Sequence, residues 1–146
     1  MVIGLISKGG KGCLLNLTKV LEAESKNIKV QFMGRVSDDV ASDMFDMCTI
    51  ISNLLNNAIE ACEKIQEDKR IIEFEIAGYN SQIFISVRNS YDMESIINQK
   101  QKFITTKEDK LNHGIGLENV RITVKKYDGD MRISQENERF IVTINI

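Results

Sequence analysis

The segment from Asp43 to Lys64 carries apolar residues at three- and four-residue steps. This spacing predicts one long amphipathic helix, because such positions share one face of a 3.6-residue turn. The apolar face comprises Met44, Met47, Cys48, Ile51, Leu54, Leu55, Ala58, Ile59 and Cys62. A helix with one apolar face has to pack that face against another layer of the fold.

The opposite face of this helix is polar and includes Asn53 and Asn57, one turn apart. Asparagine is a middling helix former, because its side chain competes with the backbone for hydrogen bonds. A role in a ligand site would offset that local cost. The alternative is a solvated helix face that happens to carry asparagines.

A second segment carries glycines, in the order His113-Gly114-Ile115-Gly116-Leu117. Glycines let a backbone approach a ligand closely, and Leu117 to Tyr127 then predicts an amphipathic helix. Free amides and the positive end of the helix dipole would suit an anion such as phosphate. The alternative is a plain turn before a helix, which would have the same sequence pattern. The spacing matches neither a P-loop nor a dinucleotide-binding fingerprint.

Together, NLLNNAIEAC (Asn53 to Cys62) and HGIGLENVRITVKKYDG (His113 to Gly129) resemble the N box and G2 box of one ATP-binding superfamily. Its members are gyrase, heat-shock chaperones, histidine kinases and mismatch-repair ATPases. The chain is most similar to catalytic domains of peptide-sensing, quorum-type histidine kinases, from Leu14 to Ile146. The resemblance implies the Bergerat fold: an α+β, two-layer α/β sandwich with a mixed, mostly antiparallel sheet and helices on one face. We expect one domain over residues 1–146, with residues 1–12 flexible.

The resemblance implies catalytic roles for two asparagines. Asn57 matches the ligand of the magnesium ion that bridges the ATP phosphates, and a neutral oxygen ligand suits this hard cation. Asn53 would lie beside the same phosphates, where hydrolytic relatives usually have a glutamate. An amide cannot take a proton from water, so the chain resembles phosphoryl donors to histidine more than ATP hydrolases. The amides of Gly114 to Leu117 would bind the phosphates.

The adenine end departs from the family pattern. A predicted strand from Gln82 to Arg88 leads to Asn89, at the place where the family usually has the Asp of an Asp-x-Gly-x-Gly box. The Asn89 oxygen can accept the same hydrogen bond from adenine without the charge. Both glycines of the box are absent. The alternative is an ordinary Asn-Ser turn at a strand end.

Tyr91 to Asn112 is polar and occupies the place of the family's mobile ATP lid, which we expect to become ordered on binding ATP. The resemblance implies that Thr106 and Lys107 contact the nucleotide. Glu60 stands where relatives often have a lysine, so Lys64, Lys107 or Lys110 has to neutralise the phosphate charge. For each of these lysines the alternative is a position in a solvated loop. His113 has a capping or lid-shaping role in our interpretation, with general-acid catalysis as the alternative.

Composition restricts the function classes. Nineteen basic and twenty-one acidic residues give a formal net charge of −2, and dispersed basic residues argue against nucleic-acid binding. Cys13, Cys48 and Cys62 have no metal-binding spacing and suggest buried thiols in a reducing cytosol. No window is apolar enough for a membrane span. We therefore expect a soluble chain without direct membrane contact, and the resemblance implies that it is the cytoplasmic portion of a membrane-bound bacterial receptor kinase.

The expected function is binding of Mg-ATP and donation of the γ-phosphoryl group to a histidine on a separate dimerisation domain. His113 is the only histidine and belongs to the expected ATP site. A response regulator would be the downstream partner. The alternatives are a stand-alone ATPase of the same fold and a regulatory nucleotide-binding module without transfer activity.

Overall fold

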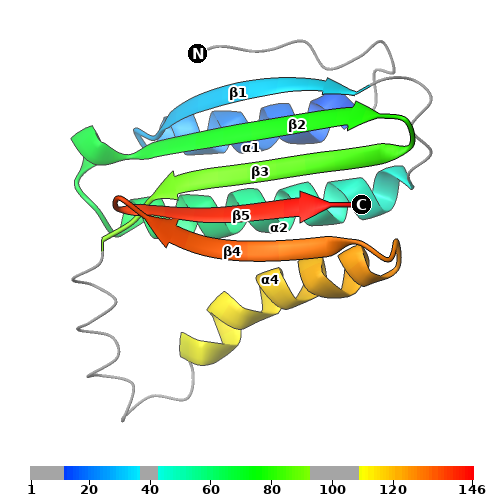
Figure 1. Ribbon diagram of the computed structural model, residues 1–146. Coiled ribbons are helices and arrows are strands. Elements are labelled where there is room, and N and C mark those ends of the chain that lie inside the picture. The colour runs from blue at the N-terminus through cyan, green and yellow to red at the C-terminus, as the bar shows by residue number, and fades with distance from the viewer. Residues whose placement is uncertain (1–11, 37–42, 93–108) are drawn as a thin grey trace.

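The computed structural model describes residues 12–36, 43–92 and 109–146 (Figure 1). In these parts the helices are α1 (Gly12–Ser25), α2 (Met44–Glu63), the 3-10 helix η1 (Glu67–Lys69) and α4 (Asp109–Lys125). The strands are β1 (Lys29–Val36), β2 (Ile71–Tyr79), β3 (Gln82–Ser90), β4 (Asp130–Glu136) and β5 (Arg139–Asn145).

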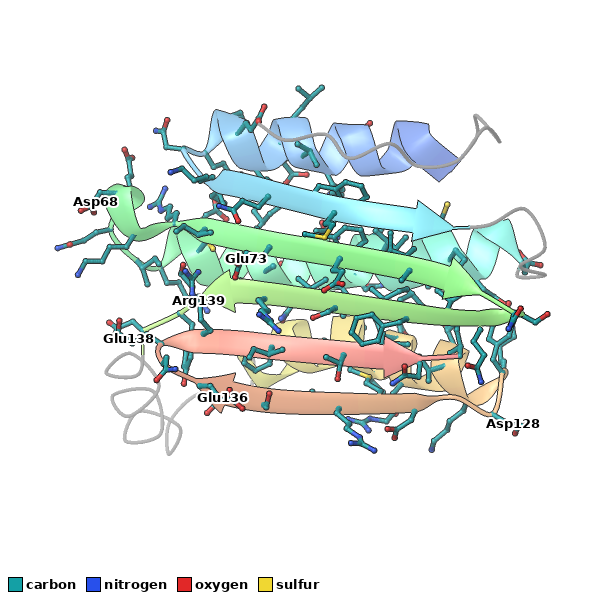
Figure 2. The ribbon with its side chains drawn as sticks, turned by 45° about the horizontal axis from the view of Figure 1, so that its top comes forward. Asp68, Glu73, Asp128, Glu136, Glu138 and Arg139 are labelled. Carbon is teal, nitrogen blue, oxygen red and sulfur yellow. The ribbon has the colours of Figure 1, made fainter. Side chains whose placement is uncertain are left out.

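The strands form one mixed sheet in the order β1-β2-β3-β5-β4. β1 runs parallel to β2, and the other neighbouring pairs are antiparallel. Helices α1 and α2 lie behind the sheet in Figure 1, and Figure 2 shows the yellow helix α4 behind β5 and β4, so the helices cover one face and the chain has two layers. The predicted α+β sandwich with helices on one face is confirmed.

Helix α2 begins and ends close to the positions that the sequence predicts. The Asp43 carboxylate caps the helix, because its Oδ1 accepts a hydrogen bond from the Phe45 amide at 2.7 Å. The apolar face is buried: Ile50, Ala58 and Cys62 are 0% exposed. This face packs on the sheet, where Ile72, Ile85 and Ile144 are equally inaccessible.

Two tight hairpins close the antiparallel part of the sheet. Asn80 and Ser81 connect β2 to β3 with φ of 50° and 62°, and Asn137 and Glu138 connect β4 to β5 with φ of 48° and 59°. Positive φ at both central residues is the conformation that matches the right-handed twist of paired strands. The segment after Phe140 alternates apolar and polar residues, which predicts a strand with one buried face. In β5 Val142 and Ile144 are accordingly buried toward the helices.

The boundaries of α4 and β3 differ from the sequence prediction. Helix α4 begins at Asp109, two turns before the predicted start at Leu117, so the end of the predicted polar lid is helical. Strand β3 continues through Asn89 to Ser90, past the predicted end at Arg88, so the alternative of an Asn-Ser turn at this point is wrong. The rest of the predicted lid, residues 93–108, and residues 1–11 lie outside the described parts of the chain.

Candidate functional site

Asn53 brings the two sequence motifs together. Its Oδ1 lies 3.4 Å from the position that a Cβ atom on Gly116 would occupy. Its Nδ2 donates a hydrogen bond to the Thr49 carbonyl oxygen at 2.8 Å, one turn earlier in α2. The carboxamide is therefore oriented by its own helix, and its oxygen faces the glycine segment of α4. Helices α2 and α4 pack against each other at this point.

Asn57 lies one turn after Asn53 on the same side of α2 and is partly exposed. A partly exposed carboxamide oxygen fits a magnesium ion, which binds through few protein oxygens and keeps several waters. No group of three or more His, Cys, Asp or Glu side chains in the described residues could hold a metal ion. Asn57 is the residue that the sequence analysis expects to bind the metal.

Asn89 lies near the end of β3, on the side of the sheet that faces the helices. Its register partners are Ile72 in β2 and Phe140 in β5, and the residue is 1% exposed. Its Nδ2 donates a hydrogen bond to the Ser90 carbonyl oxygen at 3.0 Å. In Figure 1 the end of β3, the end of α2 and the first turns of α4 lie at the same end of the molecule.

The Ser90 side chain anchors the strand end that carries Asn89. Its Oγ accepts a hydrogen bond from the Ile71 amide at 3.1 Å and donates one to the Ile71 carbonyl at 3.3 Å. The Arg139 guanidinium, at the left edge of the sheet in Figure 2, donates to the same Oγ at 2.9 Å. β3 continues past Arg88 because Asn89 pairs with β2 and β5 and Ser90 pairs with Arg139 of β5, and the Ser90 hydroxyl adds a side-chain link to Ile71.

Behind this strand end lies a buried thiol. Cys62 Sγ is 3.8 Å from the Ser90 carbonyl oxygen and 3.7 Å from that of Ile71. Burial raises the pKa of the thiol to about 11, which keeps it protonated and able to act as a weak donor to both carbonyls. The predicted role of Cys62 as a buried apolar-face residue is confirmed. The sequence did not predict its contact with Ser90.

The glycine segment lies inside helix α4 rather than before it. Amides from the fifth residue of an α-helix onward bond to carbonyls four residues earlier, so a start at Asp109 places Gly114 to Leu117 within the hydrogen-bonded part. The expectation of uncapped amides at this position is therefore corrected for this conformation. Leu117 packs against the core, whereas Ile115 is 51% exposed.

Other predicted site residues are only partly placed. Thr106 and Lys107 lie outside the described residues. His113 and Lys110 are on the first turns of α4, and the structure describes only their backbone. Lys64 is exposed and forms the C-cap of α2.

A polar cluster that the sequence did not reveal joins the far ends of α2 and α4. Asp46 is 8% exposed and accepts hydrogen bonds from Lys126 Nζ at 2.9 Å and from the Tyr127 hydroxyl at 2.7 Å. The Lys126 ammonium and then the Tyr127 hydroxyl hold the pKa of the Asp46 carboxyl below its ordinary value. The cluster fixes the relative position of the two helices that carry Asn53 and Gly116.

Comparisons with solved structures agree on one fold. The nucleotide-free catalytic domain of histidine kinase ThkA matches with a TM-score of 0.65 at 21% identity, over 92% of this chain and 89% of that one. Mycobacterial sensor histidine kinase MprB matches with 0.63 at 11% identity, over 92% of both chains. Full-length ShkA in complex with AMPPNP matches with 0.65 at 13% identity, over 99% of this chain and 31% of that one.

At these identities the structural matches establish the fold alone. No curated protein matches the chain in sequence. No helix among the described residues is long and apolar enough to cross a membrane. The family model described as the GHKL domain matches residues 43–146, which include both asparagines of α2, Asn89 and the glycine segment. The chain therefore belongs to the GHKL domain family.

Proposed function

We propose that this domain binds Mg-ATP and donates the γ-phosphoryl group to a histidine on a separate dimerisation domain. The observation that carries the proposal is the contact between Asn53 and Gly116. It puts the asparagine face of α2 against the glycine segment of α4, as a site shared by both motifs requires. The GHKL family match supports ATP as the ligand.

In this proposal the chain contributes positioning and charge stabilisation rather than covalent chemistry. Asn57 would hold the magnesium ion, whose positive charge offsets the charge of the phosphates when it is bound. In the transfer, a nitrogen of the acceptor imidazole forms a bond to the γ-phosphorus, and the bond from that phosphorus to the bridging oxygen breaks. The leaving group is ADP, which keeps the electron pair of the broken bond.

Backbone amides of the glycine segment would donate hydrogen bonds to the phosphates. Because α4 is helical from Asp109 in this conformation, the first turns of the helix have to open before those amides can donate to a ligand. Glycine makes such opening less costly, since each glycine inside a helix is about 1 kcal/mol less favourable than alanine. Gly114 and Gly116 are the two glycines in α4.

Asn53 supports transfer to histidine over hydrolysis. A hydrolase needs a group that accepts a proton from water, and a carboxamide does not do so. Its nitrogen is also occupied by the Thr49 carbonyl. A stand-alone ATPase would turn ATP over without an acceptor. A regulatory module would bind ATP without turnover or transfer, even when the acceptor is supplied.

The proposal includes partners beyond this chain. The acceptor histidine would lie on a dimerisation domain of the same kinase, and a response regulator would receive the phosphoryl group afterwards. We place the domain in the peptide-sensing branch of the histidine kinases, on the cytoplasmic side of a membrane-bound receptor. The basis for that branch is the sequence of the two motifs, NLLNNAIEAC and HGIGLENVRITVKKYDG.

The decisive experiment is a titration of the chain with a fluorescent ATP analogue, with and without magnesium. We expect binding that tightens when magnesium is present. A second step incubates the chain with γ-labelled ATP. We expect no acid-labile label on the chain alone, since its only histidine is His113, and slow labelling of a cognate dimerisation hairpin added in trans. Steady ATP turnover without the hairpin would contradict the kinase assignment.

A further inference from the structure

Strand β4 forms an edge of the sheet, because the strand order is β1-β2-β3-β5-β4. The backbone groups of successive residues in a strand point to opposite sides. Directly after β5, Ile146 exchanges backbone hydrogen bonds with Ile83 of β3, at 2.7 and 3.0 Å. Even-numbered residues of β5 therefore bond to β3, and odd-numbered ones bond to the even-numbered residues of β4. The residues of β4 that direct their amides and carbonyls to the open edge are Met131, Ile133 and Gln135.

This edge is available for pairing. No further strand pairs with it in the part of the chain that the structure describes, and a free strand edge is a template for another strand. Ile133 pairs with Val142, which is buried toward the helices, so the odd-numbered side chains of β4 face that way. None of them is the inward-pointing charge that often protects an edge. Ile133 is 41% exposed, so an added strand would also cover apolar surface.

We propose that β4 pairs with β4 of a second copy of this chain, antiparallel and about a two-fold axis at Ser134. A symmetric pair joins the outward backbone groups only if odd-numbered residues lie opposite odd-numbered residues. The registers that meet this condition and pair at least five residues of each strand join residues 130–134, 130–136 or 132–136. They are centred on Arg132, Ile133 and Ser134, respectively.

Charge decides between these registers. The register centred on Arg132 puts the two Arg132 side chains opposite each other, and the one centred on Ile133 puts Asp130 opposite Glu136 of the second copy. The register centred on Ser134 puts Arg132 opposite Glu136 of the second copy, and the symmetry repeats this pair. Opposite charges that face each other across two strands stabilise the pairing, whereas like charges destabilise it. The strand is thus complementary to itself in the Ser134-centred register.

Both charged residues are accessible for this contact. The Arg132 side chain is 80% exposed, and its Nε bonds to Asp130 Oδ2 at 2.8 Å, which leaves further guanidinium donors for a second carboxylate. Glu136 is exposed. The other edge strand, β1, offers no such match, because its charged residues are the basic Lys29 and Arg35. Two copies of β1 would therefore bring together like charges but no opposite ones.

The test measures self-association of the chain by sedimentation equilibrium, without nucleotide. Five paired residues a side make a contact smaller than a standard interface of about 1,600 Å², so we expect a weak dimer with a Kd above about 1 μM. Arg132→Glu and Glu136→Arg should each weaken the dimer about tenfold or more, because both symmetric pairs become repulsive. An equimolar mixture of the two variants should associate again, since each chain supplies the charge that the other lacks.

Ser134→Cys tests the register. The two residues at position 134 would form a non-hydrogen-bonded pair with Cα atoms about 4.5 Å apart, which lies within the range that a disulfide spans. Mild oxidation should therefore link two copies of this variant through position 134, as mass spectrometry of the cross-linked peptide would show. Gln31→Cys, at an exposed position of β1, is the matched control and should cross-link much more slowly. The unmodified chain measures cross-linking by the native cysteines.

Three results would overturn the proposal. One is an unmodified chain that stays monomeric up to about 1 mM, and another is a dimer that neither charge variant weakens. The third is cross-linking of Gln31→Cys as fast as that of Ser134→Cys, which would show random collision rather than a paired edge. None of these measurements requires ATP, so the edge pairing and the proposed function can fail separately.

Discussion

The Asp46 carboxylate and the Lys126 ammonium, 80 residues apart in sequence, lie 2.9 Å from each other. Asp46 belongs to the first turn of α2, and Lys126 directly follows α4. The pair therefore fastens together the ends of the two helices that lie farthest from Asn89. Farther along, the same helices approach each other through Asn53 and Gly116.

Replacing Asp46 with Asn should lower the stability of the domain at neutral pH. Because the native state lowers the pKa of this carboxyl, its contribution is present above the unfolded pKa of about 3.9 and is lost as the pH falls through the lowered native value. Urea unfolding at pH 7 and pH 3 measures this difference. The difference in the free energy of unfolding between Asp46→Asn and the parent should be smaller at pH 3 than at pH 7.

Asp130→Asn is the matched control for Asp46→Asn. Asp130 pairs with Arg132 at 2.8 Å, but the two side chains are 56% and 80% exposed, and exposed pairs contribute little. A loss of stability in Asp130→Asn as large as that in Asp46→Asn would contradict a special role for the α2–α4 cluster.

Substitutions at two glycines should separate folding from nucleotide binding. In Gly116→Ala the new methyl group meets, among the described residues, only Asn53 Oδ1, at 3.4 Å. The variant should fold and gain up to about 1 kcal/mol in stability from helix propensity. Its affinity for ATP should fall, because the stiffer helix resists opening and the methyl group narrows the approach to Asn53. Urea unfolding and the ATP titration measure the two effects.

Gly34→Ala serves as the contrasting variant. Its new methyl group would collide with Ile76 Cγ2 inside the sheet and would lie 3.0 Å from Phe32 Cζ. Overpacking of this kind costs about 1–3 kcal/mol, so this variant should be destabilised. Nucleotide affinity of its folded fraction should stay unchanged. A Gly116→Ala protein that binds ATP as tightly as the parent would argue against the glycine segment as part of the site.

Asn57→Ala should remove the part of ATP affinity that depends on magnesium and should leave the domain folded. Its side chain lies on the partly exposed side of α2, away from the buried apolar face. Asn56→Ala, at the neighbouring and also partly exposed position, is the control and should retain the magnesium effect. Equal enhancement by magnesium in Asn57→Ala and the parent would refute the assignment of Asn57 as the ligand.

Cys62 should resist alkylation in the native protein at pH 8.5. Burial raises the pKa of its thiol to about 11, and thiol reagents attack the thiolate. Mass spectrometry of peptides after iodoacetamide treatment should find Cys62 labelled only after denaturation. Because folding raises the pKa of the thiol, the contribution of protonated Cys62 to the free energy of unfolding is present below the pKa of the unfolded thiol. It is lost as the pH rises toward 11. Rapid labelling under native conditions would show that the strand end opens.

Regular periodicity made the central elements predictable from sequence. The three- and four-residue steps identify α2 almost to its ends, since Asp43 and Lys64 are its two caps, and the alternation after Phe140 identifies the inward face of β5. Asn53, Asn57 and the glycine segment stood out because their residue types are unusual in their context and because they resemble two known motifs.

Contacts between distant residues were not predictable in the same way. The first turns of α4 are polar and lack an apolar period, so nothing in Asp109 to Asn112 indicated a helix. Asn89 and Ser90 are typical turn residues, but both pair with β5 in the sheet, and the Ser90 hydroxyl also bonds to Ile71. The contact of Asp46 with Lys126 depends on how α2 and α4 cross, which no local pattern encodes.

Helix α2 packs against α1, α4, β2 and β3, and this central position has a consequence for hydrogen exchange. Amides buried in the middle of a cooperative unit exchange their protons only when the whole unit unfolds, whereas peripheral turns open on their own. The backbone around Asn53 and Asn57 should therefore exchange as slowly as the core. The first turns of α4 should exchange much faster. Of the two helices proposed to form the site, α2 would then be preformed, whereas the start of α4 would change conformation on binding.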